Sequence, residues 1–171
     1  DDIGYLGHDV WLGPQCGWWS VQDVNSSRRE AKAVWPPDPY LAFAATHVVA
    51  RSPERLVLEG VDSPVTGVRL LKSFAFDAAD PSTVVVTAIA RNIRKRPLSR
   101  DLWFNTRTSA ATRVYVPVAD ARDVRVEAAE EAAPAWRIEG GVFSFLPAPS
   151  DAALRRGKVF LQPSAGWMAG F

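Results

Sequence analysis

Two segments near the N-terminal end of the sequence combine indole rings with polar groups that could bind a ligand. Residues 7–15 read GHDVWLGPQ and contain Trp11, and residues 35–40 read WPPDPY and contain Trp35 and Asp38. The prolines of the second segment restrict its backbone, so that an indole and a carboxylate can be held at fixed positions. An indole has an apolar body and one N–H donor, which suits the C–H face and the hydroxyls of a sugar. We therefore predict that Trp11, Trp35 and Asp38 bind carbohydrate, against the alternative that these tryptophans fill the core.

A third segment, residues 100–107 (RDLWFNTR), carries a row of side chains with the same character. Alternate side chains of a β-strand share a face, so Trp103, Asn105 and Arg107 would present an aromatic platform, an amide and a guanidinium in line. Arg69, on a preceding predicted strand, would join this row if the pairing register allows it. The alternative is a solvated outer face on which the arginine stem covers apolar surface.

The two histidines, His8 and His47, are the only candidates for acid–base chemistry by a residue that titrates near neutral pH. Neither lies in a zinc-binding pattern such as H-x-H or H-E-x-x-H, and we predict no metal site and no cofactor. A metal held by carboxylates from distant strands is an alternative that the sequence leaves open. His8 precedes Asp9, but neighbours on a strand point to opposite faces, so a structural role for His8 is favoured. Serine nucleophile and phosphate-loop motifs are absent.

Composition excludes several functional classes without identifying an activity. The chain has 171 residues, of which 47% are hydrophobic and 23% charged, and its net charge is +1. Binding to nucleic acid through an excess of positive charge is therefore not expected, and no apolar stretch is long enough to span a membrane. The single Cys16 excludes an internal disulfide and leaves the cellular compartment open. The oligomeric state is open as well.

The hydrophobic pattern is mostly of period two and predicts an all-β protein. Strand candidates are residues 41–50, 55–60, 66–76, 83–93, 102–108, 112–118, 123–127, 136–139, 142–146 and 158–161. The turn-rich residues 77–82 predict that 66–76 and 83–93 form an antiparallel hairpin. Helical character is confined to residues 128–135 and a turn at 150–155. The spacing of the strands predicts one antiparallel β-sandwich domain over residues 1–171.

The order of these segments resembles the aldose 1-epimerase (galactose mutarotase-like) superfamily, in particular an uncharacterised bacterial branch of it. The similar stretches are residues 7–15, 35–39, 63–70 (SPVTGVRL), 91–92, 101–105 (DLWFN) and 166–169 (GWMA). The resemblance implies a twisted antiparallel supersandwich whose concave sheet binds a monosaccharide or the end of a glycan. Both ends of the chain read as the inside of a folded segment, and we expect it to be a portion of a longer domain, truncated at both ends.

Epimerases of that superfamily use a histidine as the acid and a glutamate as the base. The stretch similar to their histidine-bearing strand reads LWFNT at residues 102–106, and the glutamate belongs to a segment beyond Phe171. Our first hypothesis is therefore a carbohydrate-binding, mutarotase-like domain. The second is a sugar epimerase, an isomerase in which His8 or His47 serves as the acid. The third is a structural or assembly β-domain without a ligand.

Overall fold

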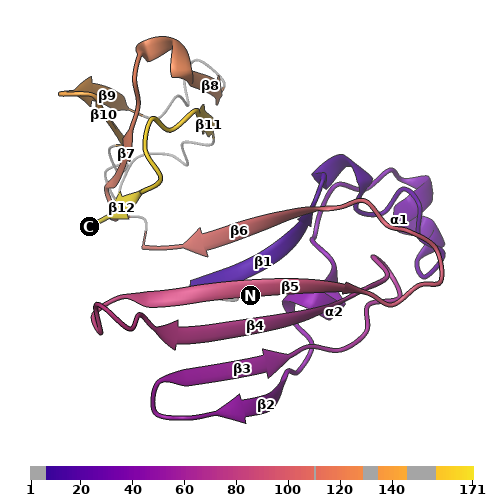
Figure 1. Cartoon of the computed structure of the whole chain (residues 1–171). Coiled ribbons are helices and arrows are strands. Elements are labelled where there is room, and N and C mark those ends of the chain that lie inside the picture. Colours follow the sequence, from indigo (N-terminus) through magenta and orange to yellow (C-terminus); the bar gives the residue numbers. More distant parts are fainter. Residues whose placement is uncertain (1–6, 110, 129–134, 146–156) are drawn as a thin grey trace. The chain divides into compact units, whose positions relative to one another are not determined.

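The computed structural model describes residues 7–109, 111–128, 135–145 and 157–171 (Figure 1). The chain divides into two compact units, one formed by Gly7–Thr106 and the other by the described part of Arg107–Phe171. Each unit is built from short antiparallel sheets, and each is considered by itself. The predicted all-β, antiparallel sandwich class is confirmed. The assignment of residues 1–171 to one domain stays a prediction.

A four-stranded sheet forms the larger layer of the first unit. Its strands are β2 (His47–Arg51), β3 (Arg55–Glu59), β4 (Val68–Phe76) and β5 (Val84–Asn92), each paired antiparallel with the next. The β4–β5 hairpin is the one expected from residues 77–82, because Asp77 and Asp80 accept hydrogen bonds from nearby backbone amides and hydroxyls in that turn. The predicted hairpin is confirmed with nine residue pairs in register.

A second layer consists of β1 (Gly7–Gly13) and β6 (Asp101–Arg107), which pair with each other. Val10 and Leu12 of β1 pack against Val68 and Leu70 of β4, and all four side chains are buried. Because alternate residues share a face, these pairs identify the inner faces of both layers. Burial of each such side chain contributes about 1.5–3 kcal/mol to the hydrophobic stabilisation of the unit.

Short helices occupy the loops between β1 and β2. A 3₁₀ helix spans Gln15–Gly17, and α1 (Ser26–Glu30) begins after Asn25, whose side chain accepts a hydrogen bond from the amide of Arg28. The strand expected over residues 41–50 is wrong in its first part, where α2 (Pro39–Ala42) forms. Asp38 caps this helix and Pro39 occupies its first turn, where the missing N–H of proline costs nothing.

The second unit contains one four-stranded sheet and one two-stranded sheet. The larger has the order β12 (Ala169–Gly170), β7 (Val114–Pro117), β10 (Val142–Phe145), β9 (Trp136–Glu139), and the smaller pairs β11 (Gly157–Leu161) with β8 (Val124–Ala128). Gly140 and Gly141, with φ of 56° and 74°, form the β9–β10 turn, which requires the left-handed region at both positions. Ala128, the first residue of the helical segment predicted over residues 128–135, instead ends strand β8. Residues 129–134 of that segment, and the helical turn predicted at 150–155, lie outside the described residues.

Candidate functional site

The two strands β1 and β6 place Trp103 and Asn105 on the outer side of the first unit. The ring of His8 on β1 lies 5.4 Å from the ring of Phe104, and its Nδ1 is 2.8 Å from Oγ1 of Thr106. These contacts put Phe104 and Thr106 on the same side as His8. Since side chains alternate along a strand, Trp103 and Asn105 point to the opposite side.

Gly13 allows the indole of Trp103 to lie directly against β1. A Cβ atom built at Gly13 would lie 2.5 Å from both Cε2 and Nε1 of Trp103, closer than carbon atoms can approach without displacement. The ring therefore packs across the backbone of β1 at a position that only glycine leaves open. Trp103 nevertheless keeps 38% of its surface exposed, so the ring is supported on one side and accessible on the other.

Three further indoles form a cluster, and one of them, Trp11, shares its face of β1 with Gly13. The ring of Trp11 meets the rings of Trp18 and Trp35 edge to face, at centroid distances of 5.6 and 5.7 Å. Asp9 accepts the indole N–H of Trp11, and the carbonyl of Leu12 accepts that of Trp18 at 2.6 Å. Trp35 stays 47% exposed. We call the surface formed by Trp11, Trp35 and Trp103 the tryptophan face.

The backbone that carries Trp35 is held by two side chains that were not among the predicted site residues. Arg28 donates from Nη1 to the carbonyl oxygen of Trp35 at 2.7 Å, and Trp19 donates its indole N–H to the carbonyl oxygen of Pro36 at 2.9 Å. The guanidinium of Arg28 also lies over the ring of Trp19, 5.1 Å from its centroid. These contacts fix the Trp35–Pro36 backbone.

The carboxylate of Asp38 is buried and bonded to protein groups rather than open to a ligand. Its Oδ1 accepts the amide N–H of Tyr40, and its Oδ2 accepts the hydroxyls of Ser63 and Thr66. A carboxylate oxygen has no donor of its own, and both oxygens here are already occupied by protein donors. Asp38 therefore joins α2 to the loop that precedes β4 and is not part of the tryptophan face.

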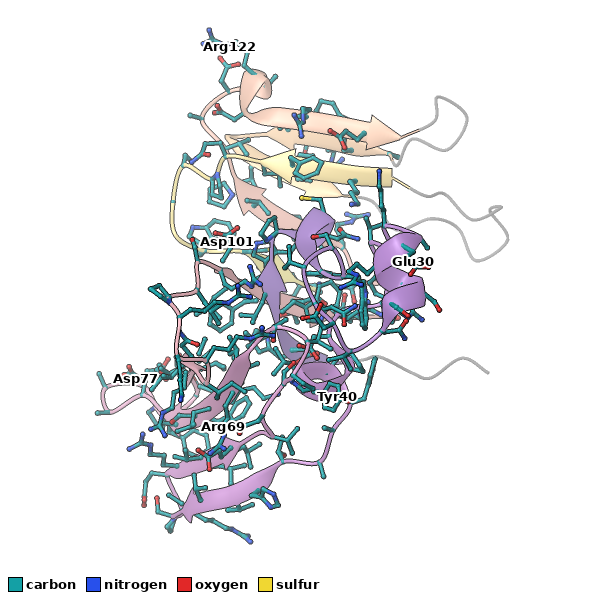
Figure 2. All side chains as sticks on the ribbon, turned by 90° about the vertical axis from the view of Figure 1, so that its right-hand side faces the viewer. Glu30, Tyr40, Arg69, Asp77, Asp101 and Arg122 are labelled. Carbon is teal, nitrogen blue, oxygen red and sulfur yellow. The ribbon has the colours of Figure 1, made fainter. Side chains whose placement is uncertain are left out.

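Arg69 lies on the other side of the four-stranded sheet, because it alternates with the buried Val68 and Leu70. Figure 2 shows Arg69 on this sheet, apart from Asp101 at the start of β6. Its Nε donates to Asp62 at 2.7 Å, and its Nη1 is 3.6 Å from Glu59. The strand register does not bring Arg69 into the row of Trp103.

His47 also lies away from the tryptophan face. It is the direct cross-strand neighbour of Glu59, and Glu59 forms an ion pair with Arg91 at 3.7 Å in addition to its pair with Arg69. Arg69 and Arg91 face each other across β4 and β5. Like charges at such a position repel, and Glu59 between them offsets the repulsion.

The Arg69–Asp62 pair predicts a pH effect. The hydrogen bond from Arg69 holds the pKa of Asp62 below its ordinary value of 3.8. The stability that this pair contributes is therefore complete above that ordinary value and is lost as the pH falls through the lowered pKa. In Arg69→Gln, we expect the pKa of Asp62 to rise toward 3.8, measured by NMR titration of its carboxyl carbon. Arg91→Gln is the matched control and should leave this pKa in place, and an unshifted Asp62 in Arg69→Gln would contradict the assignment.

The remaining predicted residues are His8 and Arg107. Nε2 of His8 is buried and has no hydrogen-bond partner among the described residues, so this nitrogen does not reach a ligand on the outer face. Arg107 is the last residue of β6 and belongs to the second unit, so we do not include it in the tryptophan face of the first unit.

The described part of the chain lacks two further kinds of site. No group of three or more histidine, cysteine, aspartate or glutamate side chains is arranged there to hold a metal ion. Within the same residues, no helix has both the length and the apolar character needed to cross a membrane.

Comparison with known proteins gives a family for the chain. No curated protein and no solved structure matches it. The model of one family, the domain of unknown function DUF4380, matches residues 1–171. A match over the full length of the sequence shows membership, and the chain therefore belongs to the DUF4380 family.

Proposed function

We propose that the tryptophan face binds a carbohydrate, as a monosaccharide or the end of a glycan. The observation that carries the proposal is the indole of Trp103, which is supported on Gly13 and 38% exposed. A ring fixed in this way offers a flat apolar surface without losing side-chain freedom when a ligand binds. Such a surface suits the C–H face of a sugar ring, as the resemblance to mutarotase-like proteins also implies.

Polar groups near the indoles favour a ligand that carries hydroxyls. Asn105 follows Trp103 on the same face of β6, and its amide makes no hydrogen bond to any other described residue. An amide supplies two donors and one acceptor oxygen, which matches a hydroxyl that both donates and accepts. Trp35 adds a second exposed indole, supported by Trp11 and Trp18. Asn105 and the two indoles are therefore the residues we assign to the binding site.

The proposal concerns binding rather than catalysis. Ring opening of a sugar needs an acid and a base in reach of the ring, while stacking and hydrogen bonding need no titrating group. The tryptophan face offers indoles and an amide, which do not transfer protons at neutral pH. The carboxylate of Asp9 beside it accepts the indole N–H of Trp11 and lies 3.7 Å from Nζ of Lys72. His47 and Arg69 lie on the other side of the four-stranded sheet, and the buried core separates them from this surface.

Calorimetric titration with a panel of neutral monosaccharides tests this function. We expect saturable binding of at least one sugar, and loss of about tenfold in affinity in Trp35→Ala, because one exposed stacking surface is removed. Trp167→Ala is the matched control, since Trp167 is 49% exposed but lies in the other unit. Equal affinities of Trp35→Ala and the unmodified chain would remove Trp35 from the site, and an absence of binding across the panel would refute the proposed function.

A further inference from the structure

The second unit contains an apolar cavity of about 660 Å³ that is widely open to solvent and is lined only by residues of this unit. Val116 of β7 and Leu161 of β11 lie on one part of its wall, and Val116 is buried. The segment from Pro163 to Met168 supplies the rest of the lining. A volume in this range is typical of sites for small organic molecules.

The segment that forms this wall is attached to the sheet at both ends. Pro163 bridges to Val118, and the amide of Ser164 donates to the carbonyl of Pro117 at 2.9 Å. At the other end, β12 (Ala169–Gly170) pairs with β7. The cavity wall is thus held in place before any ligand binds, and Trp167 and Met168 remain 49% and 66% exposed on it.

The chemistry of the lining defines the ligand. No lining residue carries an ionisable side chain, so a charged ligand would gain no charged partner there, while an apolar ring would cover apolar surface. The indole of Trp167 favours an offset stack with an aromatic ring, and the thioether of Met168 favours contact with a ring edge. The hydroxyl of Ser164 has no hydrogen-bond partner among the described residues, which leaves it available to a polar group of the ligand.

We propose that this cavity binds an uncharged aromatic molecule that carries one hydroxyl group. The aromatic ring stacks on Trp167 and contacts Met168, and the hydroxyl forms a hydrogen bond with Ser164. The site does not depend on carbohydrate binding by the first unit, and the two proposals fail or succeed separately.

Equilibrium dialysis of the full chain with 2-naphthol and with naphthalene tests the site. We expect one saturable site for 2-naphthol, and a loss of affinity of about tenfold in Trp167→Ala. Ser164→Ala should weaken 2-naphthol about fivefold and leave naphthalene unchanged, because only the first ligand has a hydroxyl. Phe104→Ala is the control, since Phe104 is 53% exposed but lies in the other unit, and this variant should bind both ligands like the unmodified chain.

Met168→Glu provides a test that does not depend on the stability of the tryptophan variant, since the side chain of Met168 is largely exposed. A carboxylate at this position should weaken both ligands, because it places a charge at the wall of an apolar site. The proposal is overturned if 2-naphthol shows no saturable binding, if Trp167→Ala and Met168→Glu bind it unchanged, or if Ser164→Ala weakens both ligands equally.

Discussion

Replacing Asp38 with alanine should lower the free energy of unfolding by about 3 kcal/mol, the largest stability effect we expect from one polar side chain. The change removes the cap of α2 and leaves the hydroxyls of Ser63 and Thr66 buried without their acceptor. Each buried group that loses its partner costs about 1–3 kcal/mol. Urea unfolding followed by circular dichroism measures the loss, and Asp38→Asn should give a smaller one because it retains an acceptor oxygen.

Asp80 provides a matched control for this prediction. Like Asp38 it accepts one backbone amide and two hydroxyls, from Ser82 and Thr83, but it lies in the exposed β4–β5 turn. Water can replace those bonds, so Asp80→Ala should destabilise the protein much less than Asp38→Ala. Equal destabilisation in the two variants would show that burial of Asp38 does not govern its contribution.

Replacing Trp103 with alanine should weaken sugar binding at least about tenfold while the unit keeps its fold. The exposed part of the indole is the surface that we assign to the ligand, and the core residues Val10, Leu12, Val68 and Leu70 do not depend on it. Titration calorimetry measures the affinity, and circular dichroism at the same temperature verifies the fold. Unchanged affinity in a folded Trp103→Ala variant would exclude this indole from the site.

Gly13→Ala tests the support of the Trp103 ring without changing Trp103 itself. The added methyl group would occupy the space of Cε2 and Nε1 of Trp103, so the ring must move away from β1. We expect a weaker sugar affinity although no ligand-binding atom has been removed, and a change in near-ultraviolet circular dichroism from the indole. Gly166→Ala is the control, since a Cβ there meets no atom within 4 Å. Identical behaviour of the two glycine variants would contradict the role given to Gly13.

The β4–β5 hairpin could be predicted from the sequence because its information is local. β-Branched and apolar residues continue on both sides of a turn rich in aspartate, serine and proline, and few other structures fit that order. Strand β1 was not predicted, since GHDVWLG contains two glycines and an aspartate and becomes a strand through its pairing with β6, far away in the sequence. Helix α2 has a local signature, Asp38 followed by Pro39, but the neighbouring prolines of this segment also fit a rigid loop, which is what we predicted.

The candidate site was predictable to a similar extent. Alternation along a strand suffices to place Trp103 and Asn105 on one face, and the contacts of His8 with Phe104 and Thr106 agree with that placement. The positions of Arg69 and His47 depend on which face of the four-stranded sheet packs against β1, and a single sequence does not contain that information. The support of Trp103 by Gly13 joins residues 90 positions apart and could be seen only in the structure.

The most direct test of the carbohydrate proposal uses the seven tryptophans as reporters. In a two-dimensional ¹H–¹⁵N NMR spectrum, each indole N–H gives one signal, which single substitutions assign. On saturation with a bound sugar, we expect the signals of Trp103 and Trp35 to shift most. Those of Trp136 and Trp167, in the other unit, should stay in place. Unchanged signals from Trp103 and Trp35 throughout the titration would contradict the account.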